Sequence, residues 1–309
     1  MSHVNINLKH TPQPAAAAAS SGHVIALMWK QLRPKQWTKN LLVFAALLFS
    51  LKRVELSAVY HSLIVFFLFC FVSGCVYIIN DYSDREADRV HPVKRHRPMA
   101  SGALNPAVAL GTGAVLLIGS LAASYFIHPL LTAVLAVYFV LNVAYSFKLK
   151  HVVILDIMTI AAGFVLRAIA GGLAIHVNLT PWFLLCTMLL SLFLAIGKRR
   201  HELFLLADQK GTHRKVLDNY SFALLDQLIS IVATATVISY SLFTFTAGRT
   251  THLMWTIPFV IYGIFRYLYL IHVEKKGGAP DRLLFEDKHI FVTVILYVIS
   301  VLAIFILFE

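Results

Sequence analysis

Four acidic side chains and an asparagine dominate residues 80–102, NDYSDREADRVHPVKRHRPMASG, a stretch that separates two long apolar segments. Such a dense cluster at the end of a membrane-spanning segment is costly unless something charged binds there. If the preceding helix continues, Asn80, Asp84 and Asp88 recur every fourth residue and share a face, which Asp81 borders. Oxygen ligands on one side of a helix suit Mg²⁺, a hard cation that shares its coordination shell with water and substrate phosphates. The spacing predicts a magnesium–diphosphate site. Its metal ligands would be Asn80, Asp81, Asp84 and Asp88, and the three aspartates would be the catalytic carboxylates.

A basic run follows the acids and would bind the phosphate oxygens that the metal leaves uncovered. It consists of Lys94, Arg95 and Arg97, and we take Arg95 as a candidate substrate-binding residue. The alternative is a solvated, salt-bridged loop, because mixed charges between membrane spans are common. The regular spacing of the acids favours the metal site.

A second polar cluster, YSFKLKH, closes a later apolar segment and contains Tyr145, Lys148 and Lys150. It is either a phosphate clamp or an ordinary basic turn with an interfacial tyrosine. Asp156 and Arg167 follow within the next apolar segment. Each would be costly alone in hydrocarbon, so each should face a polar cavity or a partner. They are eleven residues apart, about three helical turns, and therefore share a face of one helix.

A third cluster, GKRRHE, lies at residues 197–202. On a helix Lys198 and Glu202 pair across four residues, and Arg199 lies between them. On its own the cluster is more typical of a cytoplasmic anchor after a span. Lys39, near the start of the first apolar segment, is a further candidate phosphate ligand.

The elements that position these residues are membrane helices. The chain has 309 residues, of which 59% are hydrophobic and 14% charged, which is too apolar for a soluble domain of this size. Several apolar runs approach or exceed about 18 residues, the length that predicts a spanning helix. We therefore expect an all-α membrane protein of about nine transmembrane helices. The predicted spans lie near 41–55, 57–79, 104–126, 130–147, 152–175, 181–198, 228–248, 253–272 and 289–308.

The basic residues divide unequally between the two sides of this layout. With the N-terminus inside, 22 of the 27 Lys and Arg residues fall in inner segments and 3 in outer loops, a strong positive-inside asymmetry. We expect an integral protein of the inner or plasma membrane with its polar chemistry on the cytoplasmic side. The net charge of +12 fits anionic lipid and not nucleic acid. Residues 1–22 are expected to form a disordered cytoplasmic tail before a single transmembrane domain at 23–309.

The string NDYSDREAD at 80–88 resembles the NDxxDxxxD motif of the UbiA-type intramembrane prenyltransferase superfamily. It also falls where that family carries it, at the end of the second apolar segment. Within the superfamily, the stretches at 33–40, 145–172 and 197–203 are similar to polyprenyl-phosphate phosphoribosyltransferases. The resemblance covers nearly the whole chain. It implies nine helices around a central polar cavity that opens to the cytoplasmic side and to lipid.

The resemblance also implies an activity: Mg²⁺-dependent transfer of 5-phosphoribosyl from phosphoribosyl pyrophosphate to a polyprenyl phosphate, with inversion at C1. One departure from the superfamily pattern supports this branch. Aromatic prenyltransferases carry a second acid motif, DxxxD, where this chain has Lys198-x-x-x-Glu202. One acid cluster with extra cations suits one metal-bound diphosphate and one metal-free phosphate. The candidate substrate-binding residues are Lys39, Arg95, Tyr145, Lys148, Lys150, Asp156, Arg167, Lys198, Arg199 and Glu202.

Two other functions remain open at this point. A prenyltransferase that moves a polyprenyl group from its diphosphate to an aromatic or other lipophilic acceptor keeps the first acid motif but must explain the missing second one. A transporter for an anionic substrate fits nine spans with inner cations. However, transporter sites lie near the midplane of the membrane, whereas the polar residues of this chain gather at one face.

Overall fold

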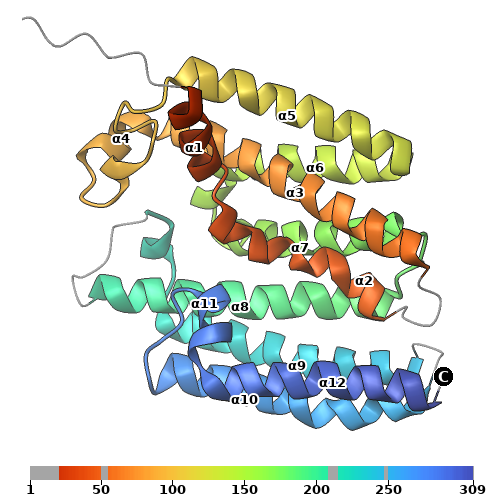
Figure 1. Cartoon of the computed structure of the whole chain (residues 1–309). Coiled ribbons are helices and arrows are strands. Elements are labelled where there is room, and N and C mark those ends of the chain that lie inside the picture. The colour runs from red at the N-terminus through yellow and green to blue at the C-terminus, as the bar shows by residue number, and fades with distance from the viewer. Residues whose placement is uncertain (1–20, 50–54, 208–214, 247–249, 309) are drawn as a thin grey trace, which may run out of the picture.

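The computed structural model describes residues 21–49, 55–207, 215–246 and 250–308, and no β-strand occurs in these ranges (Figure 1). The described chain is helical almost throughout, as expected from its long apolar runs. The main α-helices are α1 (Ser21–Gln31), α2 (Ala45–Leu48), α3 (Leu56–Ser83), α4 (Arg85–Val90), α5 (Pro106–Ile127), α6 (Pro129–Phe147), α7 (Leu155–Ala174), α8 (Pro181–Ala207), α9 (Phe222–Thr246), α10 (Ile257–His272), α11 (Pro280–Glu286) and α12 (Lys288–Phe308). Short 3₁₀ segments join them: η1 (Pro34–Phe44), η3 (Lys94–His96), η4 (Leu149–His151), η5 (Lys215–Asn219) and η6 (Thr251–Thr256).

Proline after a capping side chain starts two of the long helices. The Asn105 side chain accepts a hydrogen bond from the backbone N–H of Ala107, and Pro106 takes the first helical position of α5. His128 caps α6 in the same way before Pro129. Proline is favoured at this position because its missing N–H is one that the helix leaves unpaired. The capped helices α5 and α6 together form one antiparallel pair.

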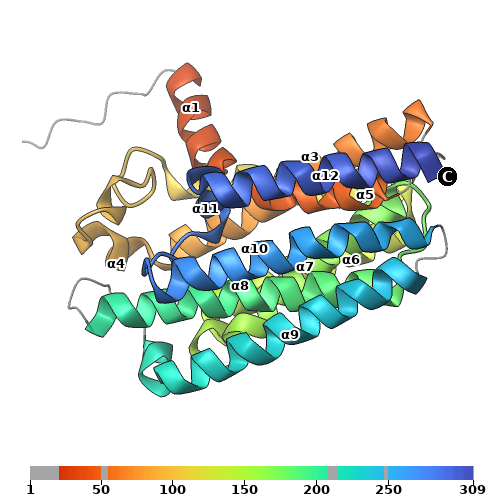
Figure 2. The same cartoon turned by 90° about the horizontal axis from the view of Figure 1, so that it is seen from below.

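The long helices form two groups that meet where α7 packs against α8. The first group, α3, α5, α6 and α7 with η1, encloses a core that includes Phe69, Leu131 and Leu135. The second, α8, α9, α10 and α12, encloses a core that includes Phe193 and Leu225. Figures 1 and 2 show the first group as orange to green ribbons and the second as cyan to blue ribbons.

The eleven-residue 3₁₀ segment η1 lies directly on α7. A Cβ atom added at Gly171 of α7 would lie 2.1 Å from the carbonyl oxygen of Val43, so only glycine allows this approach of two backbones. A 3₁₀-helix rises about 2.0 Å per residue and an α-helix about 1.5 Å. The η1 and α2 segments together therefore extend roughly 28 Å, close to the hydrocarbon thickness of a bilayer.

Eight helices of the described ranges are long and apolar enough to cross a membrane. They correspond to eight of the nine predicted spans. The first predicted span, 41–55, coincides with the end of η1 and with α2, and its residues 50–54 lie outside the described ranges. The predicted tail, 1–22, falls almost wholly outside them too, although α1 begins at Ser21.

Successive long helices run in opposite directions, so the polar clusters gather at one end of the bundle. In Figure 1 this is the left end, where the α4 region and the last turns of α8 lie. The C-terminus lies at the opposite end (Figures 1 and 2). The acid motif, the turn after α6 and the GKRRHE segment, far apart in sequence, are thus brought to the same face.

Candidate active site

Two carboxylates of the acid motif converge on one cation. Arg97 Nη1 lies 3.0 Å from Asp81 Oδ1 and 2.6 Å from Asp88 Oδ2. The two acidic residues are only 3% and 2% exposed. Since a buried carboxylate without a partner costs several kcal/mol, the Arg97 guanidinium allows both acids to lie close together in the folded chain.

The junction between α1 and η1 contacts Asp81 from a third direction. Gln31 Nε2 donates to Asp81 Oδ2 at 2.8 Å, and the Arg33 guanidinium donates to Oδ1. Arg33 also lies 4.6 Å from the ring centroid of Tyr77. Its φ of 53° is in the left-handed region, which residues other than glycine rarely adopt. A residue with a strained backbone thus ties the segment before η1 to the acid motif.

Asn80 and Asp84 form a separate pair at the end of α3. The helix ends at Ser83 and α4 begins at Arg85, with Asp84 at the junction. Asn80 Nδ2 donates to Asp84 Oδ2 at 3.2 Å, and both side chains are partly accessible. The predicted single face of Asn80, Asp84 and Asp88 is therefore interrupted: the side chains associate as Asn80 with Asp84 and as Asp81 with Asp88.

A buried network surrounds Arg199 of α8. Its Nε donates to Asp156 Oδ2 at 2.6 Å, its Nη1 to Glu202 Oε2 at 2.6 Å and its Nη2 to Tyr145 Oη at 3.2 Å. The side chains of Arg199 and Asp156 are 1% and 0% exposed. The network joins α6, α7 and α8, so these four candidate residues, which are scattered in the sequence, form one cluster.

Tyr220, between η5 and α9, completes this network. Its hydroxyl donates to Asp156 Oδ1 at 2.7 Å and accepts from the backbone N–H of Ile154 at 2.8 Å. Burial, together with the hydrogen bond to the carboxylate, raises the pKa of Tyr220 above its ordinary value. Tyr220 therefore stays a neutral donor, and both oxygens of Asp156 are paired.

Lys198 of α8 is partly accessible next to this network. It lies close enough to Glu202, Lys39 and Arg199 to interact with their charges. Lys39 is on η1, in the first helical group, and Lys198 is on α8, in the second. The charges of these two lysines, one from each group, therefore repel one another, and an anion between them would reduce this repulsion.

Arg167 lies apart from the other candidates, within α7. Its Nε donates to Asn40 Oδ1, its Nη2 to Tyr138 Oη and its Nη1 to the Gly163 carbonyl, at 2.8, 2.7 and 2.8 Å. It is 7% exposed. Arg167 thus has polar partners inside the bundle, as expected for a charged residue in an apolar segment. It links η1, α6 and α7, whereas Asp156 pairs with Arg199 and Tyr220.

Three candidate cations lie at the edge of the polar face. Lys148, just before η4, is exposed, and Lys150, within η4, is partly exposed. Arg95 is exposed, and its Nε lies 3.4 Å from His96 Nε2. The inward-directed arginine of this loop is Arg97, and the sequence prediction of Arg95 as the substrate-binding arginine did not include it.

Gln31, Arg33 and Tyr220 are partners of the candidate acids that the sequence did not predict. Gln31 and Arg33 precede the first apolar segment, and no periodicity connects them to the motif some fifty residues later. The one local signal is Arg33 before Pro34, at a point where α1 must end.

No group of three or more His, Cys, Asp or Glu side chains in the described ranges is arranged to hold a metal.

The sequence is similar to a described protein family and to named enzymes. The sequence model described as the UbiA prenyltransferase family matches residues 40–294. A decaprenyl-phosphate phosphoribosyltransferase of Mycolicibacterium smegmatis is 36% identical over 301 residues, which cover 91% of this chain and 92% of the relative. The enzyme of that name from Corynebacterium glutamicum is 38% identical over 275 residues, covering 84% of this chain and 81% of the relative.

Solved structures share the fold. A UbiA homolog from Archaeoglobus fulgidus, bound to DMAPP and Mg²⁺, superposes with a TM-score of 0.67 at 18% identity, covering 91% of this chain and 99% of that one. A structure described as digeranylgeranylglyceryl phosphate synthase gives a TM-score of 0.69 at 19% identity, with 90% and 98% covered. At such low identity these likenesses concern the arrangement of the helices alone.

Proposed function

Because this chain belongs to the UbiA prenyltransferase family, we propose that it transfers 5-phosphoribosyl from phosphoribosyl pyrophosphate to a polyprenyl phosphate and releases pyrophosphate. The observation that carries the proposal is the composition of the GKRRHE cluster at residues 197–202. Where a diphosphate-binding acid pair would serve a prenyl donor, this chain has Lys198 and Glu202 around a buried Arg199. The names of the relatives that cover most of the chain support the same reaction.

The acid motif suits Mg²⁺, judged by its donor atoms. Asp81 and Asp88 already direct oxygens at one positively charged atom, Arg97 Nη1, so a divalent cation fits the same charge balance. Asn80 and Asp84 offer further oxygen donors beside them. These four residues would hold the ion, which when bound would neutralise the pyrophosphate leaving group.

Arg33 and Arg97, whose guanidinium groups a bound cation would displace from the carboxylates, have a second role in this site. Arg33 and Arg97 are paired with Asp81 through single, partly accessible contacts. When the carboxylates bind a cation, these two arginines are free to bind the pyrophosphate oxygens, in the bidentate manner that arginine favours. The same residues thus neutralise the acids before substrate binds and the diphosphate afterwards.

The acceptor phosphate binds at the GKRRHE cluster, beside Lys198. Lys198 and Lys39 supply two charges from facing helical groups, and the Arg199 network fixes the α8 turn that carries Lys198. The guanidinium of Arg199 is already bonded to Asp156, Glu202 and Tyr145. Arg199 therefore positions Lys198 and does not bind the phosphate itself. Lys148 and Lys150 lie beyond it, where they attract an anionic head group.

The chemistry needs no general base. A phosphate monoester is already ionised near pH 7, so its oxygen attacks C1 of the ribose as the pyrophosphate departs. Attack from the face opposite the leaving group inverts C1, and C1 gains oxocarbenium character on the way. Arg33 and Arg97, beside the acid motif, stabilise the negative charge that develops on the pyrophosphate. The protein also holds the attacking phosphate oxygen in line with C1 and the leaving pyrophosphate.

The reaction takes place on the cytoplasmic side of an inner or plasma membrane, with the N-terminus inside. The positive-inside asymmetry of the sequence supports this orientation. The elements that carry the polar clusters also lie at one end of the bundle (Figure 1).

A turnover assay on purified protein with Mg²⁺ tests the proposal against the prenyltransferase alternative. One reaction contains phosphoribosyl pyrophosphate and a polyprenyl phosphate; the other contains a polyprenyl diphosphate and 4-hydroxybenzoate. We expect lipid-linked phosphoribose from the first and no product from the second. Product from the second pair alone would refute the proposal.

A further inference from the structure

The buried amide of Gln31 contacts the acid motif from a distant part of the chain. Gln31 is the last residue of α1 and is 1% exposed. Its Nε2 donates to Asp81 Oδ2 at 2.8 Å, whereas its Oε1 is buried and has no hydrogen-bond partner among the residues that the structure describes. Because an ionised carboxylate only accepts hydrogen bonds, the nitrogen of the amide is the atom that faces Asp81. The amide oxygen beside it is therefore a buried acceptor without a donor, an arrangement that native structures rarely leave unexplained.

Packing against α3 fixes the position of this amide. Met28 precedes Gln31 by one helical turn, so both side chains lie on the same face of α1. Met28 and Leu32 are 8% and 6% exposed and share a core with Ile78 of α3. A Cβ atom added at Gly74 of α3 would lie 2.5 Å from Leu32 Cδ2, so the missing side chain of Gly74 makes room for the end of α1.

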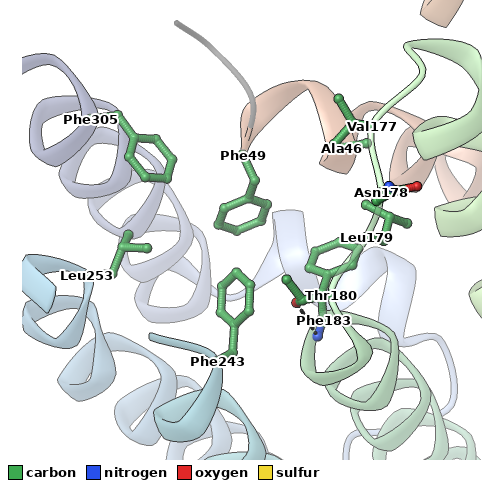
Figure 3. Close-up of a pocket in the computed structure, with 10 residues that line it drawn as sticks. All are labelled: Ala46, Phe49, Val177, Asn178, Leu179, Thr180, Phe183, Phe243, Leu253 and Phe305. Atoms are coloured by element: carbon green, nitrogen blue, oxygen red, sulfur yellow. Dashed lines mark hydrogen bonds between the residues drawn. The ribbon is translucent and has the colours of Figure 1, made fainter. Parts of the chain in front are cut away.

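The segment that follows Gln31 is also held at its far end. It runs through η1 and α2 to Phe49, whose ring stands edge-on to those of Phe183 and Phe243, with centroids 5.5 and 5.4 Å apart. These rings line an aromatic pocket of about 100 Å³, and none of its lining side chains is charged (Figure 3). The pocket is thus an apolar anchor and not a site for ions. Since the segment is held at both ends, Gln31 stays beside Asp81 when the acid motif binds a ligand.

The acids of the motif do not supply three metal ligands by themselves. In the described ranges no three His, Cys, Asp or Glu side chains are placed to hold one ion, and only Asp81 and Asp88 converge on a common atom. Mg²⁺ usually keeps several of its waters when a protein binds it. Those waters need acceptors for their hydrogen atoms, and the unpaired amide oxygen beside Asp81 is such an acceptor.

We propose that Gln31 is a positioning residue of the metal site: its Nε2 fixes Asp81, and its Oε1 accepts a hydrogen bond from a water of the Mg²⁺ shell. This inference rests on the proposed function, which places Mg²⁺ at the acid motif. An amide suits both tasks because it carries donors and an acceptor in one group, whereas an ionised carboxylate only accepts and an ammonium only donates. Groups that orient metal ligands in this way typically change metal affinity by about 10- to 100-fold.

Titration with Mn²⁺ in the absence of substrate tests the inference without relying on turnover. Mn²⁺ prefers the same oxygen ligands as Mg²⁺, and electron paramagnetic resonance measures how much of the ion stays free as the whole protein binds it. We expect Gln31→Met, which keeps the length of the side chain without the amide, to lower Mn²⁺ affinity about 10- to 100-fold. The matched control is Gln36→Met, at a partly exposed glutamine of η1, and it should bind Mn²⁺ as the wild-type protein does.

A second variant separates the two tasks of the amide. Gln31→Glu keeps an oxygen acceptor and adds a negative charge, but it loses the donor to Asp81. We expect Gln31→Glu to bind Mn²⁺ at least as tightly as the wild-type protein, and Mn²⁺ to raise its unfolding temperature by more than that of the wild-type protein. If Gln31→Glu loses as much affinity as Gln31→Met, Gln31 only orients Asp81 and the contact to the water shell is wrong. Unfolding temperatures in EDTA, which should be close for Gln31→Met and the wild-type protein, exclude loss of the fold as the cause.

The outcomes separate this inference from the proposed function, because the titration contains no substrate. If Gln31→Met binds Mn²⁺ as tightly as the wild-type protein while phosphoribosyl transfer proceeds, the inference is wrong and the proposed function stands. If Gln31→Met loses affinity but the protein transfers a prenyl group instead, the role of Gln31 stands and the proposed reaction is wrong. Wild-type protein that binds no Mn²⁺ would also contradict the inference.

Discussion

Replacing Asp156 by asparagine removes the carboxylate on which the Arg199 network depends. Both side chains are essentially inaccessible, at 0% and 1% exposure, and their contact is 2.6 Å. Breaking a buried ion pair by removing one partner costs about 3–5 kcal/mol, because the other charge is left uncompensated. Glu202 still contacts Arg199 at 2.6 Å, so we expect the lower end of that range, about 3 kcal/mol.

The adjacent arginine provides a matched control. Arg200 pairs with Asp226 at the same distance of 2.6 Å, but the two side chains are 16% and 38% exposed. Solvent screens such a pair, so Asp226→Asn should cost about 1 kcal/mol or less. The free energy of unfolding in mixed micelles, followed by circular dichroism, measures both variants. The double variant Asp156→Asn, Arg199→Gln should recover part of the loss. Equal costs for the two aspartates would refute the reasoning.

Three further predictions concern the metal, the acceptor and pH. Asp84→Asn should abolish turnover while the variant still folds and inserts, measured by product formation beside size-exclusion chromatography; full activity without Mg²⁺ would contradict the metal site. Lys198→Ala should raise KM for the acceptor about tenfold, since a charge-assisted contact is worth about 1.5–3 kcal/mol; unchanged kinetics would leave Lys198 a membrane anchor. The hydrogen bond from Arg266 holds the pKa of Asp287 below its ordinary value, so this pair stabilises the fold above about pH 3.9 and the stabilisation is lost as pH falls through the lowered pKa. An acid titration of unfolding should show that loss, which Arg266→Gln should remove; identical titrations would contradict it.

The sequence predicts the helices well because hydrophobic length is a local property. Eight of the expected spans appear as long apolar helices in the described ranges, and the end of α3 at the acid motif confirms the position of that cluster. The first span is harder to predict. The segments η1 and α2 are long enough to cross the hydrocarbon layer only because η1 is a 3₁₀ helix, which rises further per residue than an α-helix. Hydropathy gives no information about the rise per residue.

The candidate site shows where local reasoning stops. Asp156, Arg199 and Glu202 are each recognisable as charged residues in or near apolar segments, and the structure brings them together. Which residues pair is set by packing between distant helices. The sequence accordingly gives no reason to prefer Arg97 to Arg95, since both follow the acids and only the path of the loop turns Arg97 toward Asp81 and Asp88.

The central claim is that one substrate phosphate binds through metal and the other through lysine. Its most direct test is isothermal titration of purified protein with each substrate, in Mg²⁺ and in EDTA. We predict that phosphoribosyl pyrophosphate loses at least about tenfold in affinity without Mg²⁺, because a contact to a charged group is worth about 1.5–3 kcal/mol, whereas the affinity for polyprenyl phosphate stays the same. Equal dependence of both substrates on Mg²⁺ would contradict the division of the site into an acid motif and a separate cation cluster.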